Sequence, residues 1–189
     1  MDRLLELSTS LATDGASIFC WAVALALLVS AGAKLRNIEA FRLICAGYPG
    51  ALWIGVRRLA PCIILVEIAA GAAILVPVRW SLLAGIALAL AWSVIASAAV
   101  ALRRLRGEKR FRCGCGADFS QESSADWVLA RNAPVIVGLA MALAGAGARP
   151  VGASDAPLLL VAIGLVLAMH LVAAASRTWR RVREWATAG

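Results

Sequence analysis

Five apolar runs constrain the fold of this sequence more than any other feature. They cover residues 17–33, 59–78, 80–102, 133–148 and 157–175. A helix of about 20 apolar residues crosses the hydrocarbon core of a bilayer, so each run is long enough, or nearly so, to span a membrane. The fourth run is short unless its helix begins near Trp127. With 62% hydrophobic and only 16% charged residues, the chain has the composition of a membrane protein.

These runs predict an all-α fold, a polytopic membrane helix bundle with four to five transmembrane helices. We expect one integral membrane domain over residues 1–189, with the lipid bilayer as its surroundings. The segment 37–58 is expected to lie at the interface, because apolar residues recur at helical spacing among charged neighbours before Pro49-Gly50 interrupts the run. Those apolar residues are Phe41, Ile44, Cys45 and Tyr48. The sequence therefore predicts one interfacial helix in the first inner-side loop.

The basic residues are divided unequally between the two sides that this alternation defines. All of them except Arg3, Arg79 and Arg149 lie after the first run, after the third run or in the C-terminal tail. We expect the protein to lie in a bacterial-type inner (plasma) membrane. By the positive-inside rule, the N-terminus is predicted on the outer side of this membrane, and the C-terminus and loop 103–126 on the inner side. The net charge of +8 is concentrated beside apolar runs, so no nucleic-acid partner is expected.

A cysteine pair marks the polar loop 103–126, in the segment Arg112-Cys113-Gly114-Cys115-Gly116. The thiolate is the reactive form of cysteine, and the neighbouring Lys109, Arg110 and Arg112 favour it. A single glycine between the cysteines permits a tight turn, in which the sulfurs can close a strained and easily reduced disulfide. We therefore interpret Cys113 and Cys115 as catalytic residues for thiol–disulfide exchange.

The cysteines also allow a different interpretation, as ligands of a soft metal ion. Four of the five thiols lie on the predicted inner side, and sulfur is the ligand that soft metals prefer. These four are Cys45, Cys62, Cys113 and Cys115, whereas Cys20 opens the first run on the other side. The redox interpretation requires no metal ion.

Two ionisable residues lie inside the predicted spans, at similar depths from the inner side: Glu67 and His170. Such a group costs at least about 2.5 kcal/mol in hydrocarbon and usually faces a partner in the bundle interior. A contact between them would serve as a proton relay, or as the polar end of a quinone pocket that Trp92 would line. Alternatively, His170 is structural, Glu67 is protonated or paired with an arginine, and Trp92 is core. No other cofactor is expected.

Several of these residues together resemble a known family, the methylamine-utilisation protein MauE family, with a more distant likeness to DoxX-type membrane proteins. The resemblance covers about residues 17–148. It is carried by Ala31-Gly32-Ala33-Lys34-Leu35, Phe41, Tyr48-Pro49, Pro61, Glu67, Gly71, Leu75, Arg106-Gly107, Cys113-Gly114-Cys115 and Arg131-Asn132.

The resemblance implies a small integral membrane protein that works with a thioredoxin-like redox partner. Such a protein assists disulfide formation or maturation of exported proteins, as in methylamine dehydrogenase biogenesis. It implies Cys113 and Cys115 as the redox pair, although the family usually continues this pair with Phe-Gly and this chain continues with Gly116-Ala117-Asp118. Maturation of exported proteins requires thiols on the outer face, whereas the charge distribution predicts the loop inside.

Three functions are compatible with these observations. The first is a thiol–disulfide oxidoreductase, in which Glu67 and His170 move protons or bind a quinone. The second is a membrane carrier for a soft metal ion or a thiol compound. The third is a non-catalytic scaffold of a maturation complex. A homo-oligomer is compatible with each of them.

Overall fold

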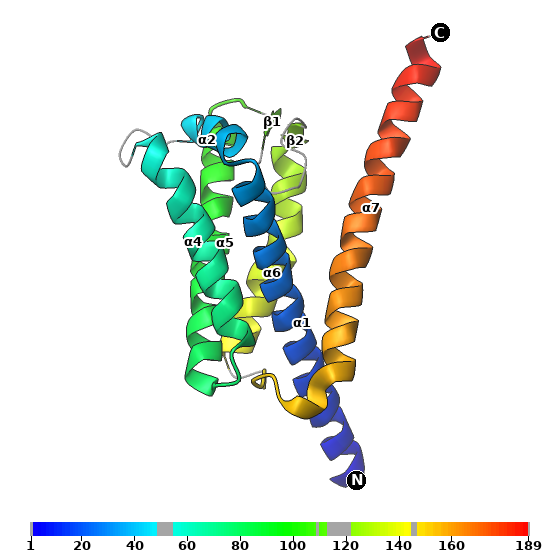
Figure 1. The fold of residues 1–189 in the computed structure, drawn as a ribbon. Coiled ribbons are helices and arrows are strands. Elements are labelled where there is room, and N and C mark those ends of the chain that lie inside the picture. Colours follow the sequence, from blue (N-terminus) through cyan, green and yellow to red (C-terminus); the bar gives the residue numbers. More distant parts are fainter. Residues whose placement is uncertain (1, 49–54, 109, 113–121, 145–146, 189) are drawn as a thin grey trace.

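The computed structural model describes residues 2–48, 55–108, 110–112, 122–144 and 147–188, and these form a bundle of long helices (Figure 1). The helices are α1 (Asp2–Arg36), α2 (Ile38–Ala46), α4 (Val56–Leu75), α5 (Arg79–Leu105), α6 (Ala125–Leu143) and α7 (Ala156–Ala188). A 3-10 turn, η1 (Ala153–Asp155), precedes α7. Two short strands, β1 (Arg110–Arg112) and β2 (Glu122–Ser124), separate α5 from α6. The predicted all-α class is confirmed, with this one small hairpin added.

Four helices are long and apolar enough to cross a membrane among the residues that the structure describes. Their apolar parts are Ser10–Arg36, Arg57–Leu75, Arg79–Leu105 and Ala125–Leu143. Helix α7 has a shorter apolar stretch, Ala156–Met169, within its 33 residues. The prediction of a polytopic bundle is confirmed, and the protein is a multi-pass membrane protein.

Helix α6 begins at Ala125, eight residues before the fourth apolar run was expected to start. Its start is set by Ser124, whose hydroxyl accepts a hydrogen bond from the backbone N–H of Trp127 (3.2 Å). Asp126 in the first turn suits the positive end of the helix dipole. Arg131 therefore lies inside the helix and is exposed, while Asn132 donates to Ser97 Oγ of α5 (3.1 Å).

The loops that are rich in basic residues lie at one end of the bundle. Figure 1 shows α2, the two strands and the C-terminal end of α7 at this end, which we call the hairpin end. The N-terminus, the turn between α4 and α5, and η1 lie at the opposite end. The chain thus runs up and down through the bundle, as the alternation of apolar runs and basic loops predicts.

Close helix contacts hold the middle of the bundle together, with α4 packed between α1 and α5. A Cβ atom added at Gly85 of α5 would lie 2.7 Å from the backbone nitrogen of Ile74 in α4. One added at Gly71 of α4 would lie 2.9 Å from the carbonyl oxygen of Ala24 in α1. Small residues therefore set the helix spacing, as is common in membranes. The buried core here comprises Cys20, Trp21, Ala24, Ala70, Ile74, Leu82, Ile86, Ala89, Leu139, Ala142 and Ala162.

Helix α2 packs across the ends of α1 and α4 and confirms the predicted interfacial helix. Its buried side chains are Phe41, Ile44 and Cys45. They form a second cluster with Ala31 of α1 and with two residues of α4, Ala60 and Ile64. The opposite side of α2 is exposed, as at Leu43. An amphipathic helix of this kind suits the boundary between protein, headgroups and water.

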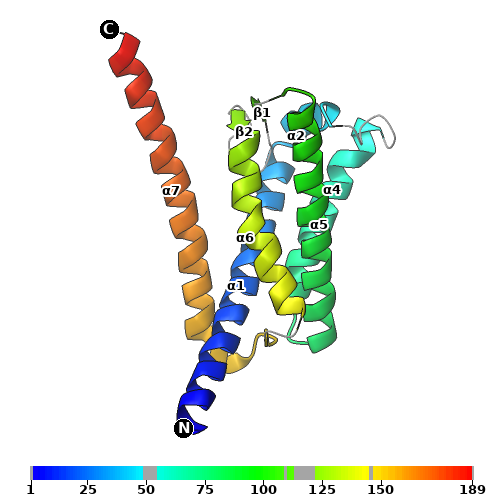
Figure 2. The same cartoon turned by 180° about the vertical axis from the view of Figure 1, so that it is seen from behind.

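Helix α7 contacts α1 near its first turns and diverges from the bundle toward the hairpin end (Figures 1 and 2). Its attachment is partly apolar, through the buried Ala162, and partly polar. Arg149 donates to Asp14 of α1 (3.1 Å) and to the buried Asp155 of η1 (2.8 Å), and its backbone N–H donates to Ser17 Oγ (3.0 Å). These contacts fasten the segment before α7 to α1 at the end opposite the hairpin.

Candidate functional site

The hairpin brackets the segment that contains the cysteine pair. Strands β1 and β2 are antiparallel, with Arg110 opposite Ser124 and Arg112 opposite Glu122. The chain therefore enters and leaves the segment 113–121 at paired positions. Cys113 and Cys115 themselves lie outside the described residues. The structure thus fixes both ends of the segment at the hairpin end of the bundle.

Phe111 anchors the hairpin between α5 and α6. Its side chain is 3% exposed, whereas Arg110 and Arg112 on either side are exposed. It packs in a small cluster with Val100, Ala125, Val128 and Leu129. Burying a phenylalanine contributes about 1.5–3 kcal/mol toward holding this strand of three residues in place.

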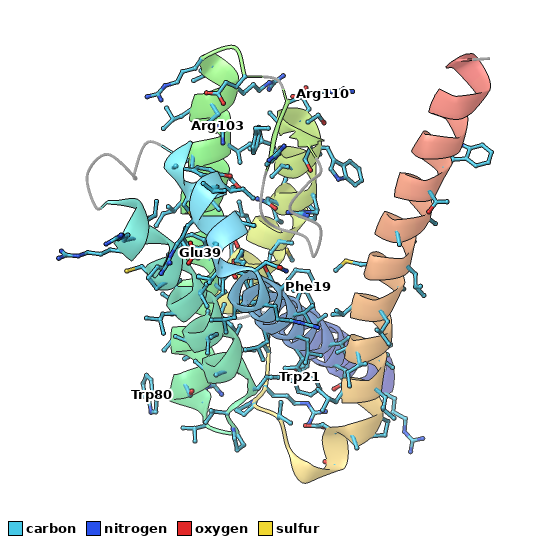
Figure 3. All side chains as sticks on the ribbon, turned by 45° about the horizontal axis from the view of Figure 1, so that its top comes forward. Phe19, Trp21, Glu39, Trp80, Arg103 and Arg110 are labelled. Atoms are coloured by element: carbon cyan, nitrogen blue, oxygen red, sulfur yellow. The ribbon has the colours of Figure 1, made fainter. Side chains whose placement is uncertain are left out.

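The guanidinium of Arg103 lies against the same hairpin. Its Cζ is 4.7 Å from the ring centre of Phe111 and 5.1 Å from that of Tyr48, which follows α2. Its Nε donates to Glu108 Oε2 (2.7 Å). Figure 3 shows Arg103 and Arg110 together at the hairpin end. Each cation–π contact contributes about 0.5–2 kcal/mol, depending on how far water is excluded.

A buried ion pair lies below α2, between α1 and α4. Lys34 Nζ donates to Glu67 Oε1 and to Ser30 Oγ (2.9 Å), and the ring of Phe41 covers Nζ at 5.3 Å. The side chains of Lys34 and Glu67 are 4% and 5% exposed. The second carboxylate oxygen, Oε2, is buried and accepts no hydrogen bond among the described residues. Charges in such a place require a partner, because desolvation costs several kcal/mol per ion.

Lys34 was not among the partners that the sequence suggested for Glu67. Lys34 directly follows the first apolar run, whereas Glu67 lies eight residues inside the second, so the runs alone do not place the two residues at the same depth. Helix α1 continues past the run to Arg36 and packs against the antiparallel α4, which brings Lys34 to Glu67. The structure therefore supplies a cation for Glu67 that is neither an arginine nor His170.

Cys45 lies in α2 next to this ion pair. Burial raises the pKa of its thiol to about 11, and the nearby ammonium of Lys34 opposes this rise. The thiol is fully buried and free. It is therefore protonated near neutral pH, and a protonated buried thiol is a poor nucleophile and a poor metal ligand.

We compared the sequence with known protein families, with curated proteins and with solved structures. The family model described as methylamine utilisation protein MauE matches residues 13–145. The chain belongs to the MauE family. No curated protein and no solved structure matches it. Within this MauE-family chain, the matched part contains the ion pair, α2 and the hairpin, whereas α7 with His170 lies beyond it.

The soft-metal interpretation gains no support from the two described cysteines of its set. Cys62 is exposed, while Ala60 and Ile64 of the same helix are buried in the cluster that contains Cys45. Residues two apart on a helix point about 200° apart, so Cys62 faces away from Cys45. Across the described ranges, no three His, Cys, Asp or Glu side chains form a group that could hold a metal ion.

The predicted quinone pocket involves three helices of this MauE-family chain. Glu67 is on α4 and the half-buried Trp92 is on the adjacent α5, whereas α7, which carries His170, lies beyond α1 (Figures 1 and 2). The side chain of His170 is outside the described part, so its contact with Glu67 stays a prediction. A quinone carbonyl accepts hydrogen bonds, and so does an ionised carboxylate. Glu67 would therefore fit a quinone only in its protonated form.

Proposed function

We propose that this protein is an integral membrane thiol–disulfide redox protein that assists disulfide formation or maturation of exported proteins. Cys113 and Cys115 would exchange with a thioredoxin-like partner. One observation carries the proposal: a Cys-Gly-Cys segment starts and ends at paired strand residues, Arg112 and Glu122. Membership of the MauE family supports it, because this family is one of methylamine-utilisation membrane proteins, for which the sequence resemblance implies a role in redox maturation.

The proposed exchange conserves electrons and protons. A thiolate of the reduced partner attacks the Cys113–Cys115 disulfide and forms a mixed disulfide, releasing one thiolate of the pair. The second thiol of the partner then attacks the partner's other sulfur, which is bonded to the pair in the mixed disulfide. The partner therefore leaves oxidised, and the pair is reduced. Two electrons and two protons pass to the pair, and a two-electron acceptor of the quinone class would restore the disulfide.

Lys34 and Glu67 would serve the proton side of this reaction. Regeneration of the disulfide releases two protons, and Glu67 Oε2 is a buried acceptor without a donor among the described residues. Lys34 holds the carboxylate in place through Oε1. His170, the other predicted proton carrier, is tested by His170→Asn, which should slow turnover without changing the redox state of the pair under oxidising conditions.

The orientation in the membrane forms part of the proposal. The basic residues gather at the hairpin end, so we place this end on the inner side of a bacterial-type inner membrane. Thiols in a reducing compartment are oxidised only transiently. The pair would then act as one step of an electron relay that crosses the membrane, since the exported proteins lie on the outer side.

The experiment that tests the function traps the mixed disulfide. Cys113→Ser and Cys115→Ser, made in the full chain in cells, should each abolish maturation activity. One of them should accumulate a covalent adduct with a thioredoxin-like protein that disappears on reduction. Cys62→Ser, which removes an exposed thiol elsewhere, is the matched control and should leave activity unchanged. Full activity of both loop variants would reject the proposal.

A second experiment tests the orientation. A membrane-impermeant maleimide is applied to intact cells and to permeabilised cells, with and without reduction. Labelling of Cys113 and Cys115 only after permeabilisation supports an inner hairpin end. Labelling in intact cells after reduction would place the pair outside and make direct oxidation of exported proteins the simpler mechanism.

A further inference from the structure

Arg103 joins three segments at the hairpin end. Its guanidinium lies between the rings of Tyr48 and Phe111, at 5.1 and 4.7 Å, and binds Glu108 in the turn after α5. The side chain is only 13% exposed. A single side chain therefore contacts the end of α2, strand β1 and the turn that leads into the hairpin.

The hairpin cannot hold its own position. Its strands have three residues each, and an isolated two-stranded hairpin is marginally stable even when it is longer. Phe111 is the one residue of β1 that turns inward. The cluster of Val100, Ala125 and Val128 surrounds it from α5 and α6, and Arg103 stacks on its ring. The position of β1 thus depends on Phe111 and on what covers it.

Tyr48, the other ring, follows a helix that is fixed to the bundle. Phe41 and Cys45 bury α2 against α1 and α4, and Phe41 covers Lys34 of the buried ion pair. The two terminal nitrogens of Arg103 lie 3.5 Å from where a Cβ of Gly47 would be, so the guanidinium also lies against the backbone there. Arg103 therefore ties the hairpin to a firmly packed element.

We propose that Arg103 is a positioning residue for the cysteine pair. By stacking on Tyr48 and Phe111, it holds β1 against the end of α2 and so fixes Arg112 and Glu122, the two residues that flank the cysteine segment. The rate of thiol–disulfide exchange depends on which sulfur is attacked and on access to it, so this placement governs the reaction. The inference rests on the proposed redox function.

Arginine suits this role better than lysine. Its planar guanidinium can stack on two rings while its edge binds a carboxylate, whereas the ammonium of lysine is a compact and strongly hydrated charge. Arg103→Lys should therefore keep the ion pair with Glu108 and weaken the stacking. A merely electrostatic role would be restored fully by lysine.

The test measures alkylation of each cysteine in the reduced, full-length protein by N-ethylmaleimide and mass spectrometry. In Arg103→Gln, Cys113 and Cys115 should react at least about fivefold faster, the change in hairpin opening that loss of both cation–π contacts gives at the low end of their range. Arg103→Lys should lie between this variant and the wild type. Cys62 is the internal reference and should not change. Alkylation rates measured over a range of pH show whether the substitution changes access to the thiols or changes their pKa.

Arg104→Gln is the matched control. It removes the same charge from the same turn of α5, but its ion pair with Asp126 is exposed. Equal rates in Arg103→Gln and Arg104→Gln would overturn the inference. Exchange with the partner is measured in parallel and should fall in Arg103→Gln alone. An inactive wild type whose thiols still react faster in Arg103→Gln would reject the redox function and keep the positioning role.

Discussion

Lys34 of α1 and Glu67 of α4 form an ion pair that is almost completely buried below the interfacial helix α2. The pair lies between two membrane-spanning helices and links them. Ser30 and the ring of Phe41 complete the surroundings of the ammonium group. Its burial makes the pair a structural contact. The pair is also the candidate proton carrier, because Oε2 of Glu67 accepts no hydrogen bond among the described residues.

Removing one member of this pair should destabilise the protein more than removing both. Glu67→Leu leaves Lys34 as an uncompensated buried charge, and Lys34→Met does the same to Glu67. Each single variant should lose about 3–5 kcal/mol in the free energy of unfolding, whereas the double variant should recover most of it. Unfolding by denaturant in detergent micelles measures this. Additive losses in the double variant would contradict a direct pair.

Glu67→Gln tests the proton role at a smaller structural cost than Glu67→Leu. Glutamine keeps the shape and the hydrogen bond from Lys34, although it leaves the buried ammonium without a counter-charge, and it does not take up a proton near neutral pH. The variant should fold and keep the Cys113–Cys115 pair, yet regenerate the disulfide more slowly, by the 10²–10⁴-fold that a positioned proton carrier typically contributes. Equal rates in this variant and in the wild type would remove Glu67 from the reaction.

The reactivity of Cys45 should depend strongly on pH. Burial raises the pKa of this thiol from 9.0 to about 11, so little thiolate exists below pH 9 and alkylation should become rapid only as the pH approaches 11. Because the pKa is raised by folding, the stability that it contributes is complete below about pH 9 and is lost as the pH rises through about 11. Alkylation rates followed by mass spectrometry, with the exposed Cys62 as control, test this. Rapid labelling of Cys45 at pH 7 would contradict it.

The spans and the interfacial helix could be predicted because the length and spacing of apolar residues act directly on the chain. The start of α6 was predicted only as an alternative, near Trp127, because Arg131 and Asn132 interrupt the apolar pattern. The structure explains their presence, because Arg131 is exposed and Asn132 binds Ser97. Ser124 is a typical N-cap residue and indicates a helix start, but the search for apolar runs does not take capping residues into account.

The hairpin and the partner of Glu67 could not be predicted, for a different reason. Strands of three residues are too short to show an alternating pattern. The contact between Lys34 and Glu67 joins positions that are 33 residues apart, and it depends on the relative rotation of two helices. Small residues such as Gly71 decide this rotation, and many of them are spread through all the spans.

The contact at Gly85 should be sensitive to a single methyl group. Gly85→Ala would place a Cβ 2.7 Å from the backbone nitrogen of Ile74, which cannot move without shifting α4. The expected loss is about 1–3 kcal/mol of unfolding free energy. Gly32→Ala in α1 meets nothing within 4 Å and is the matched control. Similar stability of the two variants would show that α4 and α5 pack less closely than in the structure.

The attachment of α7 to the bundle should depend on Arg149. Asp155 is 2% exposed, and its two carboxylate oxygens accept from Arg149 and from the backbone N–H of Gly152 (2.7 Å). Arg149→Met would leave this buried carboxylate without its cation. Hydrogen exchange should then become at least about tenfold faster in η1 and in the first turn of α7, because loss of a hydrogen bond to a charged group costs about 1.5–3 kcal/mol.

A basic residue at the same end of the molecule provides the control for this prediction. Arg79 begins α5, is exposed, and makes no ion pair within the described ranges. Arg79→Met therefore removes an equal charge without disturbing Asp155, and exchange in η1 should stay at the wild-type rate. Protection in the core around Ile74 should change less than that in η1, because most of the residues packed there come from α1, α4 and α5, and α7 contributes Ala162 alone to the fully buried set. Unaltered exchange at Gly152 in Arg149→Met would mean that apolar packing against α1, rather than this ion pair, holds the start of α7.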